Sequence, residues 1–128
     1  MTLSIFLVED DPKLRLALTS LLTTLLRANV IATAETQEEA SSWLRQHPRV
    51  WRITVLDLFL KEGTGFQVLS NMTDASERAR VIVLTNSATE AHRQACHQMG
   101  VSAVFDKTHE LEEFVDHCQQ FADPDLVH

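Results

Sequence analysis

Five short apolar runs alternate with five helix-like segments along the chain. The runs cover residues 3–8, 30–34, 52–57, 80–84 and 102–105. Each run has the length and composition of a strand that is covered on both faces. The segments between them carry apolar residues at helical spacing. Strand followed by helix, five times over, predicts an α/β domain with a parallel sheet, helices on both faces and right-handed crossovers.

Capping residues predict where these helices begin. Asp11 before Pro12 is an N-cap acceptor followed by proline at the first helical position. Capping-box patterns place Thr36 and Ser87 at two further helix starts, and Thr108 is the predicted cap of the last helix. The first helix has the broadest predicted apolar face, formed by Leu14, Ala17, Leu18, Leu21, Leu22 and Leu25.

Polar residues stand at or just past the ends of four of the apolar runs. These residues are Glu9 and Asp10, Asp57, Thr85, and Lys107. In open parallel sheets, ligands bind outside the carboxyl ends of the strands, where the strand order reverses. The pattern therefore predicts that the five side chains converge on one site.

The chemistry of the site follows from the residue types. Three carboxylates at one edge repel each other unless a cation joins them. Oxygen ligands without His or Cys favour a hard divalent ion, Mg²⁺ first. With a lysine and a hydroxyl nearby, Asp57 could attack a phosphoryl group and become an aspartyl phosphate. Asp11 borders the acidic pair, but N-capping explains its position.

Composition limits the other possibilities. At 128 residues the chain is read as one domain, residues 1–121, with a tail at residues 122–128. The net charge of −7 works against direct nucleic-acid binding and against docking on an anionic membrane. Cys96 and Cys118 are too few for a disulfide framework, and neither a membrane span nor a signal peptide is recognisable. We therefore expect a cytoplasmic setting.

Four short motifs give the chain a family resemblance. From about residue 2 to 121 it resembles the receiver domain of bacterial two-component response regulators. The motifs are Phe6-Leu7-Val8-Glu9-Asp10-Asp11-Pro12, Val55-Leu56-Asp57-Leu58 with Gly65, Val83-Leu84-Thr85, and Phe105-Asp106-Lys107. Each motif is weak alone. Their order, with separations of 47, 28 and 22 residues from Asp10 through Asp57 and Thr85 to Lys107, is specific.

The resemblance implies a doubly wound, flavodoxin-like sheet of five parallel strands in the order 2-1-3-4-5. It implies that Asp57 is the phosphoacceptor. Asp10 and Asp57 would be direct Mg²⁺ ligands, Glu9 would act through water, and the backbone carbonyl of Phe59 would be a further ligand. Mn²⁺ would substitute for Mg²⁺.

The resemblance also implies partners. Thr85 would hydrogen-bond the phosphoryl group, and Lys107 would pair with it. The donor would be a phosphohistidine on a sensor histidine kinase or a histidine phosphotransfer protein. Phosphorylation would switch a surface on the last two helices and the last strand, which a downstream protein or an output domain would read. Such a domain catalyses only its own phosphorylation and dephosphorylation, so it is not an enzyme in the ordinary sense.

Several positions depart from the family pattern. Val104 stands where an aromatic residue is common, and Asn86 where a small one is common. Thr108 replaces a proline after the lysine, so we expect a trans peptide bond there. Lys61 stands where a proline is frequent in the loop after the phosphoacceptor. These departures affect signalling and lifetime. Phe59, which lacks an amide to position water, predicts a long-lived adduct.

Two other classes are alternatives. A Mg²⁺-dependent small-molecule phosphatase also uses a strand-end aspartate, but it would normally carry a second acid where Phe59 stands. A flavin- or nucleotide-binding domain of similar topology would need a phosphate-cradling loop after the first strand, and residues 9–11 are acidic instead.

Overall fold

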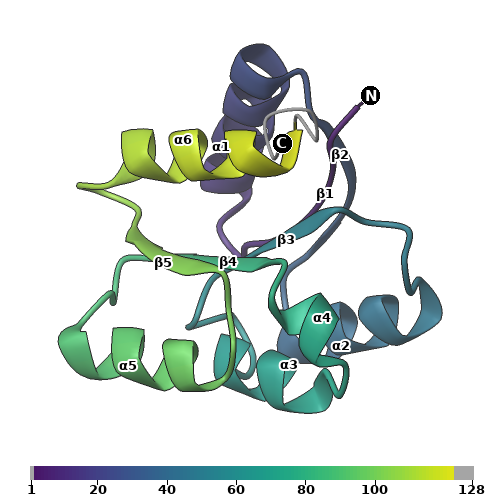
Figure 1. The fold of residues 1–128 in the computed structure, drawn as a ribbon, viewed down its shortest axis with the longest axis vertical. Coiled ribbons are helices and arrows are strands. Elements are labelled where there is room, and N and C mark those ends of the chain that lie inside the picture. The colour runs from purple at the N-terminus through teal and green to yellow at the C-terminus, as the bar shows by residue number, and fades with distance from the viewer. Residues whose placement is uncertain (1, 123–128) are drawn as a thin grey trace.

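The computed structural model describes residues 2–122, which form one sheet between two layers of helices (Figure 1). The strands are β1 (Ser4–Val8), β2 (Asn29–Ala34), β3 (Ile53–Leu56), β4 (Val81–Thr85) and β5 (Ala103–Asp106). The helices are α1 (Pro12–Leu26), α2 (Gln37–Gln46), α3 (Gly65–Asn71), α4 (Ala75–Arg78), α5 (Glu90–Gln98) and α6 (Leu111–Ala122).

The five strands are parallel and lie in the order β2-β1-β3-β4-β5. This confirms the predicted flavodoxin-like sheet. The chain winds outward from β1 in one direction to β2 and in the other through β3 to β5. The carboxyl ends of β1 and β3 therefore flank the point where the strand order reverses, where such sheets bind ligands.

Two hydrophobic cores lie on the two faces of the sheet. Helices α1 and α6 cover one face, and α2, α3, α4 and α5 lie against the other (Figure 1). Side chains alternate along each strand, so Ile5 and Leu7 of β1 pack toward α1 and α6 while Phe6 and Val8 pack into the opposite core. Burial on both faces explains why the strands read as continuous apolar runs.

Two predicted helix starts are confirmed and two are wrong. The Asp11 carboxylate accepts hydrogen bonds from the backbone N–H groups of Lys13 and Leu14, and Thr36 caps α2. Helix α5 is capped by Thr89, not by Ser87. The backbone N–H of Ser87 donates to the Thr85 hydroxyl oxygen instead, which holds residues 86–88 outside the helix.

The predicted cap of the last helix is also wrong, because α6 begins at Leu111, three residues after Thr108. The Asp106 carboxylate accepts from the backbone N–H of Thr108 and forms a turn there, while the Thr108 hydroxyl donates to Asn86 Oδ1. The peptide bonds within residues 2–122 are all trans, including the bond before Thr108. Of the predicted tail, only Ala122 is described, as the last residue of α6, and residues 123–128 lie outside the described residues.

The sequence pattern missed one helix. Helix α4 is a single turn between α3 and β4, capped by Asp74, and none of its residues is buried. An element without a buried face has no apolar periodicity from which it could be predicted.

The apolar face of α1 differs from the prediction, because Ala17 and Leu25, both predicted to lie on it, are exposed. Leu18, Leu22 and Leu26 form the buried ridge because they are spaced four residues apart, and Leu25 is 54% exposed.

Among the described residues, no helix combines the length and apolarity that crossing a membrane requires.

Candidate functional site

Three carboxylates meet where β1 and β3 end. Val8 pairs with Leu56 in the parallel ladder, so the residues that follow them emerge side by side. Glu9, Asp10 and Asp57 each present a carboxylate oxygen, and these oxygens lie within 4.8 Å of one another. Glu9 is 2% exposed and Asp57 is 7% exposed. The predicted convergence of these acids is thus present in the structure.

Lys107 lies between two of these carboxylates. Its ammonium Nζ is 2.7 Å from Asp57 Oδ2 and 2.6 Å from Glu9 Oε1. The backbone N–H of Lys107 donates to the carbonyl oxygen of Thr85, which fixes the lysine beside the end of β4. Sequence reasoning placed Lys107 at the site but did not predict its contact with Glu9.

Burial and hydrogen bonding shift the pKa values of Glu9 and Lys107 in opposite directions. Burial raises the pKa of Glu9 above its usual 4.5, although the hydrogen bond from Lys107 acts to lower it. For Lys107, burial alone would lower the pKa, but hydrogen bonds to Asp57 and Glu9 outweigh it and the net pKa is raised above 10.5. The site therefore favours a bound positive charge among the acids.

Thr85 completes the predicted set. Its side chain is almost fully buried at the end of β4, and its oxygen accepts a hydrogen bond from the Ser87 backbone N–H at 3.2 Å. The hydroxyl proton is left to donate. A cavity of about 300 Å³ opens over these groups. Its lining includes all five predicted side chains, together with Asp11, Leu14, Phe59, Asn86 and Ser87.

A half-buried arginine that sequence reasoning did not select holds the loop after β1. Arg15 Nη1 donates to the backbone carbonyl of Glu9 at 2.8 Å, and its Nη2 is 2.9 Å from Glu35 Oε1. A single arginine one turn into a helix belongs to no recognisable motif. Its role becomes visible only when the loop after β1 and the end of β2 are placed together.

Gly65 packs directly against the backbone of Asp57. A Cβ at position 65 would lie 2.4 Å from the carbonyl oxygen of Asp57, far inside the distance that real Cβ atoms allow. The Gly65 N–H also donates to the carbonyl of Leu58 at 2.8 Å. The sequence motif includes Gly65, but only the structure shows why the position excludes a side chain.

We expect Gly65→Ala to lower the free energy of unfolding by about 1–3 kcal/mol, because the methyl group must displace the backbone that carries Asp57. Urea denaturation measures the loss. Ser70→Ala, at an exposed position of the same helix, is the control. If Gly65→Ala were as stable as the wild type, the backbone of Asp57 would not restrict the side chain at position 65.

The donor set fits a hard divalent cation. Each of the three clustered acids supplies oxygen, and neither His nor Cys belongs to the cluster. Oxygen-only sets of this kind suit Mg²⁺, which usually keeps several waters and binds through one or two carboxylates.

Solved structures share this architecture. The non-phosphorylated HemR receiver domain from Leptospira biflexa is 26% identical, with 95% of each chain covered and a TM-score of 0.79. CheY from Borrelia burgdorferi, in a complex with CheX, BeF₃ and Mg²⁺, is 24% identical over 90% of this chain and 85% of that chain, with a TM-score of 0.81. The receiver domain of a Pseudomonas aeruginosa sensor histidine kinase, which has a magnesium ion in its active-site cleft, is 20% identical, covers 95% of this chain and 98% of that one, and has a TM-score of 0.77.

Sequence comparison identifies the family. No curated protein sequence matches this chain. The family model described as the response regulator receiver domain matches residues 5–119, which is most of the chain. Neither the small-molecule phosphatase nor the flavin- or nucleotide-binding alternative gains support from these comparisons. The chain belongs to the response regulator receiver domain family, whose members act in two-component phosphorelays.

Proposed function

We propose that this receiver domain takes a phosphoryl group from a phosphohistidine onto the side chain of Asp57. The observation that carries the proposal is the position of Asp57, buried at the strand-order reversal between a lysine ammonium and two further acids. Receiver domains in general interact with histidine kinases and with downstream targets.

The residues of the site suit an in-line transfer. A carboxylate oxygen of Asp57 would attack phosphorus, an O–P bond would form, and the P–N bond to the donor imidazole would break, with the imidazole taking up a proton. Lys107 would shift its ammonium from Asp57 to a phosphoryl oxygen, and the Thr85 hydroxyl would donate to another. Mg²⁺ bound by Asp10 and Asp57, by the Phe59 backbone carbonyl and by Glu9 through water would supply further neutralising charge, and Mn²⁺ would substitute.

A phosphodonor experiment tests this function. The wild-type protein is incubated with acetyl phosphate and Mg²⁺ and its intact mass is followed with time. We expect one phosphoryl adduct per chain that survives acid, is lost in base, and fails to form when EDTA removes the metal. A protein that remains unmodified under these conditions would not be acting as a phosphoacceptor.

Val104 stands where the family commonly has an aromatic residue, so another side chain would have to transmit the phosphorylated state from this site to a partner surface. Val104 is buried in one core, while Phe105 packs on the opposite side of β5 against Phe114, because side chains alternate along a strand. Arg93 of α5 spans the region instead. Its Nε donates to the Ala88 carbonyl at 3.1 Å and its Nη1 donates to the Val104 carbonyl at 2.9 Å.

The same guanidinium reaches the start of α6. Arg93 Nη2 is 2.5 Å from Glu110 Oε1, which also accepts from the backbone N–H of Asp106 at 2.9 Å. The hydrogen bond from Arg93 lowers the pKa of Glu110. One side chain thus joins the loop after Thr85 to β5 and α6, and we propose that it relays the phosphorylated state to these elements.

For Arg93→Gln we expect phosphorylation at close to the wild-type rate but a weakened response of α6. Amide hydrogen exchange with and without beryllofluoride, a mimic of the bound phosphoryl group, measures that response. The change in protection at residues 108–114 should fall at least severalfold, whereas Arg45→Gln, an exposed arginine of α2, should leave it intact. An undiminished change in Arg93→Gln would contradict the relay.

Phe59 is expected to prolong the life of the adduct. It is 47% exposed, lines the cavity and contacts Phe66 and His92, so it places only hydrocarbon where an amide could orient an attacking water. We expect Phe59→Asn to shorten the adduct half-life about tenfold or more. Phe59→Leu, which also lacks an amide, is the matched control. If the wild type lost its phosphoryl group rapidly, and Phe59→Asn lost it at the same rate, Phe59 would not have this role.

The partners and the setting follow from the same proposal. The donor would be a sensor histidine kinase or a phosphotransfer protein, and the reader a downstream protein or an output domain. A net charge of −7 favours protein contacts over direct binding to nucleic acid or an anionic membrane. We place the receiver domain at residues 1–121 and its working environment in the cytoplasm.

A further inference from the structure

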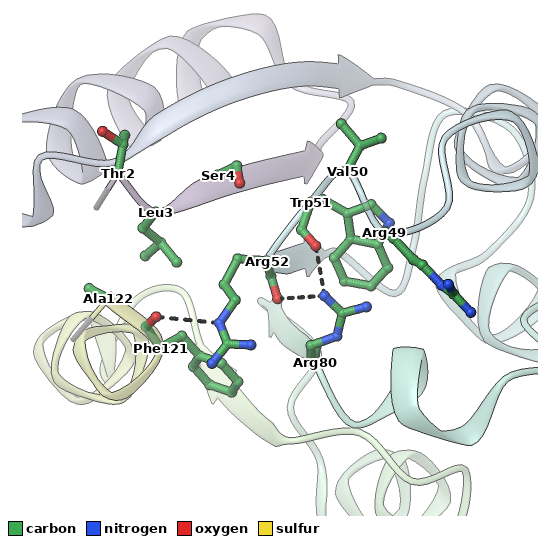
Figure 2. A pocket seen from close by; sticks show the side chains of 10 residues that line it. All are labelled: Thr2, Leu3, Ser4, Arg49, Val50, Trp51, Arg52, Arg80, Phe121 and Ala122. Carbon is green, nitrogen blue, oxygen red and sulfur yellow. Dashed lines mark hydrogen bonds between the residues drawn. The ribbon is translucent and has the colours of Figure 1, made fainter. Parts of the chain in front are cut away.

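A second cavity lies at the other end of the sheet, where the strands begin (Figure 2). Its volume is about 440 Å³. It is bounded by the start of β1, the segment before β3 and the last turn of α6. Two guanidinium groups, of Arg52 and Arg80, lie close together in it, with Trp51 and Phe121 beside them.

Each of the two arginines is anchored by one nitrogen. Arg80 Nη1 donates to the Trp51 carbonyl at 2.7 Å, and its Cζ lies 4.4 Å from the centre of the Trp51 ring system. Arg52 Nε donates to the Phe121 carbonyl at 3.5 Å, with its Cζ 5.7 Å from the Phe121 ring centre. Arg80 Nη1 also donates to the Arg52 carbonyl at 3.4 Å, so the Arg80 guanidinium is held firmly and the exposed Arg52 guanidinium more weakly. The other N–H donors of both side chains have no hydrogen-bond partner within residues 2–122.

Within residues 2–122, no carboxylate forms an ion pair with the two arginines of this cavity, although the chain has 18 acidic residues and 11 basic ones. Burial lowers the pKa of Arg80, Arg52 lowers it further, and the nearby acids Glu77 and Asp74 only partly offset them. Bringing two like charges together in a partly buried place is unfavourable unless an anion joins them.

We propose that this cavity binds a small organic phosphate monoester. A monoester carries about −1.5 to −2 charges at neutral pH, which matches two guanidiniums better than a single carboxylate does. Arginine N–H groups bind phosphate oxygens in pairs, and the aromatic and aliphatic walls accommodate an organic group. The volume is within the range of ordinary small-molecule sites. The site is distinct from the phosphorylation site and does not depend on it.

Trp51 provides the readout. In a Trp43→Phe background it is the only tryptophan, and phenylalanine preserves an aromatic ring in the stack between Phe6 and His47. The protein, without divalent metal, is titrated with phenyl phosphate while its fluorescence is recorded. We expect a saturable change, with weaker binding for inorganic phosphate, which lacks the organic group, and for benzoate, which has one charge.

Charge-matched variants decide the assignment. Arg52→Gln should weaken binding about tenfold, the loss expected for a charge-assisted hydrogen bond, and Arg45→Gln should not change it. Arg52 is exposed, so thermal melting and the NMR shift of the Trp51 indole N–H verify that the variant is folded.

The absence of a saturable change with phenyl phosphate would overturn the proposal, as would equal weakening in Arg45→Gln. It would also be overturned if binding appeared only after Asp123 and Asp125 were changed to Asn, since the chain's own carboxylates would then be the occupants.

Discussion

Asp57→Asn is expected to carry no phosphoryl group after incubation with acetyl phosphate and Mg²⁺, whereas the wild type acquires one. An amide is a poor nucleophile and cannot form the acyl phosphate, so the loss should be complete rather than partial. The fold should survive, because asparagine has nearly the same shape and can accept the hydrogen bond from Lys107 that Asp57 Oδ2 now accepts at 2.7 Å. Intact mass measures the adduct, and thermal melting verifies the fold.

The matched control is Asp116→Asn, which makes the same chemical change at an exposed position of α6. It should be phosphorylated like the wild type. An undiminished adduct on Asp57→Asn, or one lost equally from Asp116→Asn, would contradict the assignment of Asp57 as the phosphoacceptor.

Lys107→Ala is expected to lower the free energy of unfolding by about 3 kcal/mol at neutral pH without divalent metal. The substitution leaves Glu9 and Asp57 as neighbouring buried acids without their shared cation, and removal of one partner from a buried ion pair has effects of this size. It should also strongly reduce the response to phosphorylation, since a positive charge at the phosphoryl group is lost.

The pH dependence gives a second readout. The pKa of Lys107 is raised in the folded state, so its stabilising effect is complete below its ordinary value of 10.5 and is lost as the pH rises through the folded value. The difference in stability between the wild type and Lys107→Ala should therefore shrink in strongly alkaline solution. Urea denaturation across pH measures it. Lys13→Ala, at an exposed position of α1, is the control, and an equal loss in both variants would contradict the role of Lys107.

The parts of the site that could be predicted lie at the ends of strands. An acid, a hydroxyl or a lysine that closes a buried apolar run stands out in the sequence, and parallel strands bring their carboxyl ends to one edge. Asp57, Thr85 and Lys107 were recognisable for this reason. The apolar runs themselves predicted the strands of the sheet, because a strand that is buried on both faces reads as a continuous apolar run.

The parts that could not be predicted depend on contacts between distant segments. Ser87 and Thr108 both look like caps locally, but each is held by a neighbour at the site, Thr85 in one case and Asn86 in the other. The paired contact of Lys107 with Glu9 joins residues at opposite ends of the chain. Side chains such as Arg93 and Arg52 carry no local pattern, and their roles depend on which carbonyl groups the fold places beside them.

The spacing of apolar residues in α1 also did not predict which individual leucines are buried. Leu25 and Leu26 are adjacent and equally apolar, and a small rotation of the helix decides which one is covered. The sequence defines the width of the apolar face, while packing against β1 and α6 selects its edge.

Chemical trapping can locate the phosphoryl group on the chain. Wild-type protein phosphorylated with acetyl phosphate and Mg²⁺ is treated with borohydride, which reduces an acyl phosphate to an alcohol, and is then digested and sequenced by tandem mass spectrometry. We predict a reduced side chain at residue 57 and at no other acid. Asp57 would not be the phosphoacceptor if reduction occurred at Glu9 or Asp10 in its place. The same would follow if a protein that had gained the phosphoryl mass contained no reduced residue.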